Sequence, residues 1–287
     1  MKRISVLVAC VAALVSCSQN DEPKQSVEEL LPINIRTVFS RATDSNFEAN
    51  DRVGIYVVNE PNSLAESGNH VDNMGFTYNN TWTPDAPIYW FNNTTKADFY
   101  CYYPYAANAN TMALAFATKA DQSSLENYKA SEFLWGKTTG VAPTEDAVGI
   151  TVTHTFSNIL VSLKPGDGFT SESLAAASKS VKICGVKTNA SINLATGVAT
   201  PTGSASEVIP YLEGSQYRAL IVPQTTDETA LIVVNVDGTD YTLTRAMTFK
   251  ANKQHKFTVT INKSSNGVNI GIGSWDEDEE DYGGDAE

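Results

Sequence analysis

From Leu31 onward, apolar and polar residues alternate along much of the chain. One face of an extended segment carries Ile33, Ile35, Thr37 and Phe39, and the other carries Asn34, Arg36 and Ser40. Because successive side chains of a β-strand point to opposite sides, this period of two predicts a strand with one buried face. Alternating or continuous apolar runs predict further strands at 51–58, 76–82, 88–91, 97–105, 149–163, 180–186, 217–222, 230–236, 239–243 and 256–261.

The segments between these strands carry turn-forming residues. Asp237-Gly238 separates two strand-like runs by two residues, which is the pattern of a tight hairpin. Residues 193–197 predict a second turn, and residues 59–75, rich in Asn, Ser, Gly and Pro, predict a long loop. Helices are expected only as one or two turns, at 123–129 and 171–177.

Many short strands joined by turns predict an all-β fold of the sandwich type. A chain of 287 residues is long enough for two sandwiches in tandem. We place the boundary within 149–158, which gives an N-terminal β-sandwich domain at 31–152 and a C-terminal one at 153–275.

The first residues have the pattern of an export signal. Lys2 and Arg3 precede an apolar run that ends at Val15, so residues 1–16 are expected to be a secretory signal peptide. The run is too short for a stable membrane-spanning helix.

Leu14-Val15-Ser16 directly before Cys17 resembles a bacterial lipobox, in which the cysteine is lipidated and becomes the first residue. We therefore expect lipid on Cys17, so that outer-membrane lipid is one partner of the protein. Polar residues 17–30 would then form a tether. The plainer interpretation of Cys17 is an incidental thiol within a signal peptide.

The net charge of −13 argues against binding to nucleic acid, since such proteins need cations to replace the phosphate counterions. The last twelve residues, 276–287, contain eight acids and predict a solvated acidic tail. Because this tail accounts for −8, the rest of the chain is less acidic than the total suggests.

Residues suited to catalysis or metal binding are sparse. The three histidines His70, His154 and His255 are far apart in the sequence, and a single histidine on a strand is more often a packed residue than a base or a ligand. No Gly-x-Ser-x-Gly, His-Glu-x-x-His or Cys-x-x-Cys motif occurs. We predict no enzyme, no cofactor and no metal site. Cys101 and Cys184 are interpreted as core thiols in preference to a disulfide.

Aromatic residues are the remaining candidates for ligand contact. Trp82, Trp90, Tyr103 and Trp135 could stack on sugars. Aromatic residues at a period of two are more often part of a sandwich core, and we favour the core interpretation.

Several motifs, in order along the chain, resemble those of the fimbrillin family, the type V pilus subunits of Bacteroidetes. Ser40-Arg41-Ala42-Thr43, Phe47 and Asp51-Arg52-Val53-Gly54-Ile55-Tyr56 are similar to the opening of that family. Tyr102-Tyr103-Pro104-Tyr105 is similar to a strand end of the family. The later motifs are Val152 to Ile159, Leu220-Ile221-Val222-Pro223-Gln224-Thr225 and the ending Ile272-Gly273-Ser274-Trp275.

The resemblance implies two transthyretin-like β-sandwich domains, export as a surface lipoprotein and assembly with other fimbrial subunits for cell adhesion to host or bacterial surface ligands. It also implies cleavage by an arginine-specific protease, for which Arg41-Ala42 is the best match and Arg36 the second candidate. Removal of residues 31–41 would leave a groove that a neighbouring subunit fills with its own strand.

The end of the chain departs from this pattern, because the acidic tail has no alternating apolar side chains to donate. Val268, Ile270 and Ile272 alternate with Asn269 and Gly271 and form the better candidate donor strand. This departure favours an accessory, tip or anchor-like subunit over a bulk stalk subunit. The alternative function is a monomeric surface lipoprotein that binds glycans, and a hydrolase has the least support.

Overall fold

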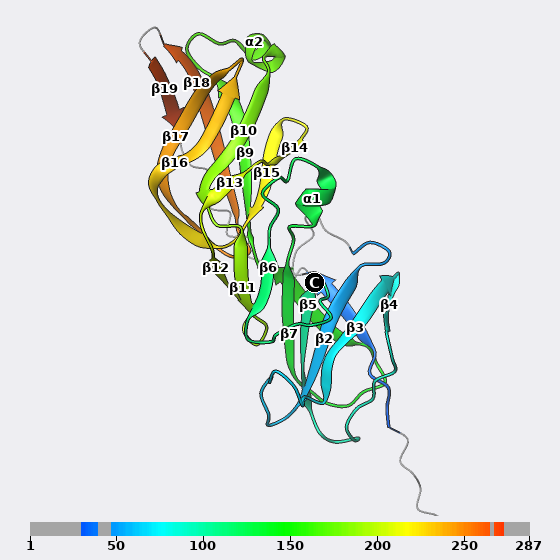
Figure 1. Cartoon of the computed structure of the whole chain (residues 1–287). Helices are drawn as coiled ribbons and strands as arrows, with labels where there is room; N and C mark the ends of the chain where they lie inside the picture. The colour runs from blue at the N-terminus through cyan, green and yellow to red at the C-terminus, as the bar shows by residue number, and fades with distance from the viewer. Residues whose placement is uncertain (1–29, 40–46, 265–266, 273–287) are drawn as a thin grey trace, which may run out of the picture.

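The computed structural model describes residues 30–39, 47–264 and 267–272 and shows an elongated molecule with two groups of sheets stacked end to end (Figure 1). Strands dominate, and the helices of the described residues are the short α1 (Leu125–Lys129) and α2 (Ser171–Ala176). The all-β prediction is confirmed. None of the helices in this part of the chain has the length and apolar character needed to cross a membrane.

The lower group contains a seven-stranded sheet in the order β1-β8-β7-β5-β2-β3-β4. Neighbouring strands are antiparallel, except that β1 runs parallel to β8. The strands are β1 (Ile35–Phe39), β2 (Arg52–Asn59), β3 (Val71–Asn79), β4 (Thr81–Pro84), β5 (Ala97–Tyr103), β7 (Leu134–Val141) and β8 (Val148–His154).

Both faces of this sheet are covered at its centre, which explains why β2 has six consecutive buried residues, Val53 to Val58. Val53, Ile55 and Val57 belong to one apolar cluster, and Tyr56 and Val58 belong to another on the opposite face. Gly54 lies on the face that carries Tyr102, and a Cβ there would lie 2.1 Å from the ring of Tyr102, so the strand has no room for a side chain at this position.

The second face is covered by a three-stranded sheet in the order β12-β11-β6, built from β6 (Leu114–Ala117), β11 (Asn189–Asn193) and β12 (Val198–Thr202). Leu114, Ala190 and Ile192 from this sheet pack with Tyr100 and Tyr102. The β11–β12 hairpin follows the proposed boundary at 152/153 in the sequence, yet it pairs with β6, which precedes that boundary. The division of the chain into two domains stays a prediction.

The upper group consists of two sheets that enclose one large apolar cluster. The four-stranded sheet has the order β13-β10-β16-β17, and the five-stranded sheet has the order β14-β15-β9-β18-β19. The strands are β9 (Ser157–Pro165), β10 (Lys179–Val186), β13 (Ser206–Val208), β14 (Tyr211–Glu213), β15 (Gln216–Ile221), β16 (Gln224–Val236), β17 (Thr239–Phe249), β18 (Gln254–Ser264) and β19 (Gly267–Ile272).

The predicted turns at Asp237-Gly238 and at residues 193–197 and the predicted short helix near 123–129 are confirmed. Asp237 and Gly238 have φ values of 49° and 86°, as a tight hairpin between β16 and β17 requires. Gly197, with φ of 73°, lies in the turn between β11 and β12. Helix α1 begins after Ser124, whose hydroxyl accepts a hydrogen bond from the backbone N–H of Asn127.

Three predicted strands do not match single strands of the structure. Residues 76–82 span the end of β3 and the start of β4, which form a hairpin, and β3 begins at Val71, inside the predicted loop 59–75. The continuous strand at 149–163 is two strands, because the chain leaves the seven-stranded sheet at Thr155–Phe156 and enters the five-stranded sheet. Residues 88–91 do not form a strand of their own, since their backbone pairs only with the segment before β1 through the bridge between Pro32 and Tyr89 and its neighbouring hydrogen bonds.

Candidate functional site at the edge strand β1

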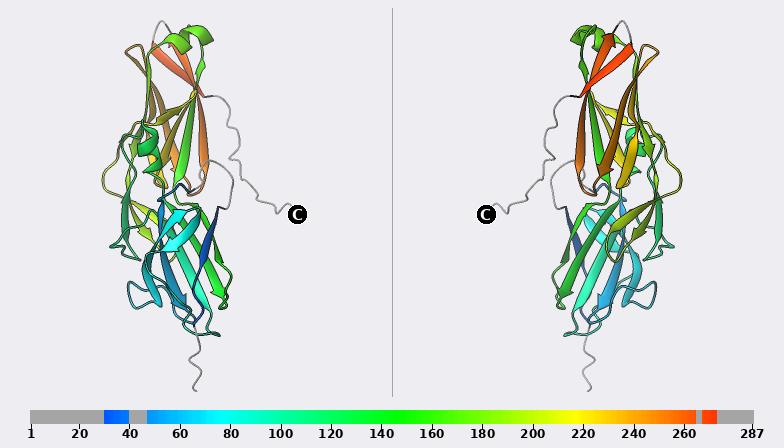
Figure 2. Two further views of the ribbon diagram at one scale, coloured as in Figure 1. Left: turned by 90° about the vertical axis from the view of Figure 1, so that its right-hand side faces the viewer. Right: turned by 90° about the vertical axis from the view of Figure 1, so that its left-hand side faces the viewer.

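Strand β1 lies at one edge of the seven-stranded sheet, and its one partner strand in that sheet is β8. Ile35 lies opposite Val148 and Phe39 opposite Val152, so all five residues of β1 are paired in register. Figure 2 shows β1, in dark blue, along the flank of the lower group. Because β1 has a partner on one side only, its loss would break no pairing between the other strands of this sheet.

The residues before β1 form backbone hydrogen bonds with a second segment, residues 88–90. The backbone N–H of Ile33 donates to the carbonyl oxygen of Ile88 at 2.9 Å, and the N–H of Trp90 donates to the carbonyl oxygen of Leu31 at 2.9 Å. The N–H of Val148 donates to the carbonyl oxygen of Asn34 at 2.8 Å. Residues 31–39 therefore lie between β8 and the 88–90 segment.

Apolar side chains make this segment part of the core. Ile33 and Ile35 are 2% and 6% exposed and belong to the cluster that contains Ile88, Trp90 and Ile150. Full burial of one isoleucine side chain contributes about 1.5–3 kcal/mol, so loss of the segment would uncover a groove that remains attractive to apolar side chains. Asn34 and Arg36 are exposed, as the alternating pattern predicts.

The arginine candidates differ in their position relative to β1. Arg36 is inside the strand, opposite Gly149. Arg41 and Ala42 lie outside the described residues, as does Cys17; Arg41 follows the last residue of β1, Phe39, by two positions in the sequence.

The structure brings together two of the four aromatic residues singled out from the sequence. Trp82 and Tyr103 both contact Phe47, with ring centroids 4.8 Å and 5.7 Å away, and Tyr78 lies 5.1 Å from Trp82. The indole N–H of Trp82 donates to Thr37 Oγ1 at 3.0 Å, which connects this cluster to β1. Sequence reasoning placed Phe47 in a family motif but did not predict that Phe47 and Thr37 contact the aromatic candidates, because these contacts join separate segments of the chain.

Tyr103 is directed inward by a polar contact. Its hydroxyl donates to Asp51 Oδ1 at 3.2 Å. Burial, together with the neighbouring Asp51 carboxylate, raises the pKa of Tyr103 above its usual range, so this phenol stays protonated under ordinary conditions.

The other two aromatic candidates are separate from this cluster. Trp90 is 1% exposed and packs edge-on against Phe99, so it lies in the core and presents no surface to a ligand. The indole N–H of Trp135 donates to the carbonyl oxygen of Leu194 at 2.8 Å, and its ring lies against Gly197. Trp135 therefore holds the β11–β12 hairpin.

The candidate donor strand, Val268 to Ile272, is part of β19. This strand pairs antiparallel with β18 at the edge of the five-stranded sheet, with Ile270 opposite Ile261 and Ile272 opposite Val259. Its backbone is therefore already paired within its own chain, and donation to a neighbour would require β19 to leave β18.

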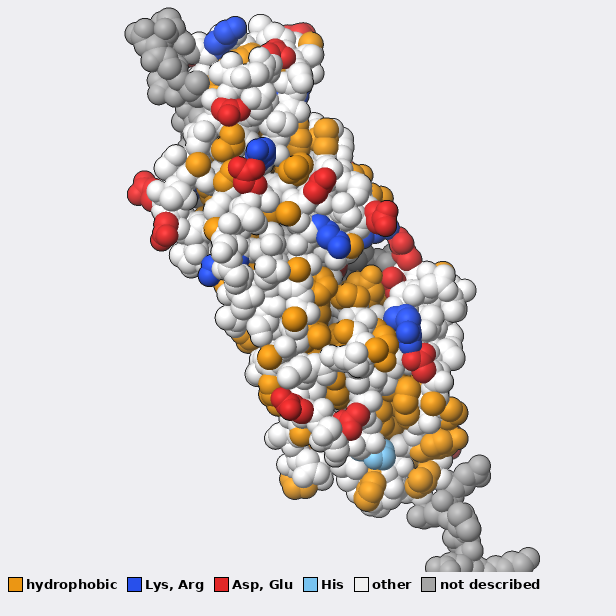
Figure 3. Space-filling view, in the orientation of Figure 1, with side chains coloured by type: hydrophobic (Ala, Val, Ile, Leu, Met, Phe, Trp, Pro, Cys, Tyr) orange, Lys and Arg blue, Asp and Glu red, His pale blue; other side chains and the backbone are white. Residues whose placement is uncertain are grey.

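Groups suited to catalysis are dispersed. His154 Nδ1 lies 2.9 Å from Glu132 Oε2, and buried His255 Nε2 accepts from the N–H of Lys250 at 3.1 Å. Cys101 and Cys184 are free thiols. The described residues contain no group of three His, Cys, Asp or Glu side chains arranged to hold a metal ion. On the face shown in Figure 3, Lys and Arg side chains are scattered among acidic ones.

Comparison with known proteins gives a consistent result. Residues 40–275 match the family model described as Fimbrillin-like. The chain is 23% identical over 300 aligned residues to a Bacteroides uniformis protein named "Putative fimbrium subunit Fim1C", and the alignment covers 96% of each chain.

Solved structures share the fold. A "putative cell adhesion protein" from Bacteroides ovatus has a TM-score of 0.68 at 19% identity, covering 86% of this chain and 97% of that one. A second, from Bacteroides uniformis, has a TM-score of 0.63 at 22% identity, covering 83% and 96%.

Proposed function

Since the chain belongs to the fimbrillin-like family, we propose that it is a fimbrial subunit of the cell surface that serves adhesion, with a structural and not an enzymatic role. The chain would be exported as an outer-membrane lipoprotein through Cys17, cleaved between Arg41 and Ala42, and assembled with other fimbrial subunits by donor-strand complementation.

The observation that carries the assembly step is the position of residues 31–39. This segment is an edge strand with two buried isoleucines and lies directly before the proposed cleavage site. Its removal would free the backbone edge of β8 and the 88–90 segment and expose the side chains that contact Ile33 and Ile35. A strand from another subunit with apolar residues at every second position would pair with the exposed backbone and cover the exposed side chains.

The pairing of β1 also supports Arg41 over Arg36 as the processing site. A protease must bind several residues in an extended, unpaired conformation, and Arg36 is in the middle of a hydrogen-bonded strand. A stalk subunit must donate a strand to its neighbour. In this chain β19 is paired with β18, and the acidic tail has no alternating apolar side chains. We therefore favour an accessory, tip or anchor-like role over a stalk role.

The decisive experiment is digestion of the purified mature chain with an arginine-specific protease. Arg41→Lys keeps the charge but removes the recognised residue, and Arg36→Lys is the matched control. We expect the native chain and the Arg36→Lys variant to yield Ala42 as the new N-terminus and then to form concentration-dependent polymers. An Arg41→Lys variant that is processed and polymerises like the native chain would refute the proposal.

Lipid attachment has its own test, with Cys10 as an internal control. Cys17→Ala should abolish incorporation of labelled palmitate and leave the protein soluble in the periplasm, whereas Cys10→Ala, within the signal, should leave labelling intact. Equal labelling of the two variants would contradict lipidation at Cys17.

A further inference from the structure

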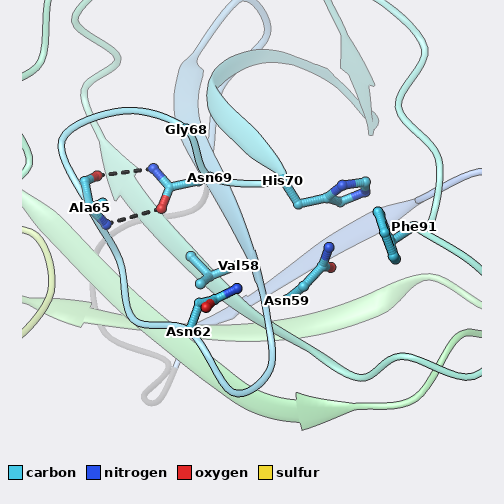
Figure 4. Close-up of a pocket in the computed structure, with 8 residues that line it drawn as sticks. All are labelled: Val58, Asn59, Asn62, Ala65, Gly68, Asn69, His70 and Phe91. Carbon is cyan, nitrogen blue, oxygen red and sulfur yellow. Dashed lines mark hydrogen bonds between the residues drawn. The ribbon is translucent and has the colours of Figure 1, made fainter.

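A hollow of about 460 Å³ lies at the side of the lower group, between the loop 59–70 and Phe91 (Figure 4). Its volume falls within the range of about 300–1,000 Å³ that is usual for small-molecule sites. It is separate from the β1 groove and contains none of the four aromatic residues singled out from the sequence.

The loop that forms one wall is shaped by Asn69. Its side-chain oxygen accepts from the backbone N–H of Ala65 at 3.0 Å, and its side-chain nitrogen donates to the carbonyl oxygen of Ala65 at 2.9 Å. Gly68, with φ of 80°, lets the chain turn back toward β3. The two hydrogen bonds are drawn in Figure 4, and they fix the loop in an open curve around the hollow.

Two other asparagines offer unused hydrogen-bonding groups. Asn59 and Asn62 line the hollow, and their side-chain amides make no hydrogen bond within the described part of the chain. An amide supplies one acceptor oxygen and two donor hydrogens, which suits a ligand rich in hydroxyl groups.

The opposite wall is aromatic and exposed. Phe91, which lines the hollow, is 57% exposed. The imidazole of His70 meets Phe91 edge-on at 5.9 Å, and its Nε2 lies 2.7 Å from the carbonyl oxygen of Tyr89. Because a carbonyl oxygen can only accept, the Nε2–H of His70 is the donor in this contact.

We propose that this hollow binds a neutral oligosaccharide, with the apolar face of one sugar ring on Phe91 and its hydroxyl groups on Asn59 and Asn62. An exposed aromatic ring beside two free amides matches the two faces of a pyranose, one apolar and one polar. None of the described lining residues is Lys, Arg, Asp or Glu, so the site offers no ion pair to a charged sugar. The inference extends the proposed adhesive function, because it names neutral oligosaccharides as the class of ligand that the subunit would bind.

The test is saturation-transfer NMR on the unprocessed monomer, so its outcome does not depend on cleavage or polymerisation. The probes are the methyl glycosides of glucose, galactose, mannose and N-acetylglucosamine, each up to about 10 mM, with sialyllactose as the charged comparison. The variants are Phe91→Ala and Asn62→Ala, both at exposed positions. Leu212→Ala, 47% exposed on β14, is the matched control.

We expect at least one neutral glycoside to bind, and the two hollow variants to weaken it by about tenfold or more while Leu212→Ala does not. Absence of binding by all four glycosides, equal binding by native chain and hollow variants, or preference for sialyllactose would each overturn the proposal. Polymerisation without any glycoside binding would overturn this inference alone and leave the fimbrial role standing.

Discussion

The indole N–H of Trp82 donates to Thr37 Oγ1 at 3.0 Å, and this bond joins the β4 edge of the seven-stranded sheet to the strand at its opposite edge. The contact is possible because the sheet curves, so that β4 and β1 approach each other. Trp82 therefore contacts β1 directly, across the gap between the two edges of the sheet.

Thr37→Val should destabilise the unprocessed protein by about 1 kcal/mol, since valine has nearly the shape of threonine but leaves the half-buried indole N–H without its acceptor. Urea unfolding measures the change. Thr83→Val, at an exposed position of β4, is the control and should stay within about 0.5 kcal/mol of the native value. Equal effects of the two substitutions would show that the Trp82–Thr37 bond contributes nothing.

The buried isoleucines predict the behaviour of the removed segment. After cleavage at Arg41, a synthetic peptide of residues 30–41 should bind the processed protein and raise its melting temperature. An Ile35→Ala peptide should bind about 2–4 kcal/mol more weakly, because Ile35 is 6% exposed in the core. An Arg36→Ala peptide should bind nearly as well as the native one, since Arg36 is exposed. Indistinguishable melting curves with all three peptides would contradict a groove at this site.

The hairpin turn at Gly197 should tolerate no side chain. Gly197→Ala places a Cβ 2.4 Å from the ring of Trp135 at a φ of 73°, so we expect a loss of about 2–4 kcal/mol in chemical unfolding. Gly238→Ala shares a positive φ of 86° but has nothing within 4 Å, and it should lose only about 1 kcal/mol. The difference isolates the contact with Trp135. A smaller loss at 197 than at 238 would mean that this ring moves freely.

Alkaline pH should weaken the fold. Burial raises the pKa of Tyr56 to about 12, and it also raises the pKa values of Tyr102, Tyr103 and the Cys101 thiol. The unfolded state then loses its protons first, so stability is fully present below about pH 8, where the unfolded thiol is still protonated, and falls as the pH rises. Each tyrosine costs about 1.4 kcal/mol per pH unit between its unfolded and folded pKa values.

The pH effect is measured by urea unfolding at pH 8, 10 and 11, with tyrosinate absorbance followed in the native protein. Tyr56→Phe should show a shallower decline because it removes one of the raised phenols. Full ionisation of all tyrosines in the folded protein near pH 10 would contradict the burial argument.

The local sequence pattern was enough to predict those strands and turns whose conformation depends on a few neighbouring residues. Residues 33–37 alternate between buried and exposed as their sequence predicts, because a strand at the surface of a core has only one apolar side. Asp237-Gly238 forms its hairpin because few other residue pairs adopt positive φ at both positions at low cost. The resemblance to fimbrillins likewise depended on short motifs in a fixed order, and the family match confirms it.

The tertiary structure decided which segments meet. No local rule brings β11 to β6, because that pairing joins residues far apart in the sequence and is selected by the shared burial of Leu114, Ala190 and Ile192. The roles of the aromatic residues were settled in the same way: Trp90 lies in the core and Trp135 under a hairpin, although both occur in similar apolar runs. The sequence by itself determined the all-β class, most of the long strands and the family, but it did not predict short strands such as β6, β11 and β12. Only packing decided that β1 would be an edge strand beside β8 and that Asn59, Asn62 and Phe91 would face one hollow, since both depend on contacts between distant parts of the chain.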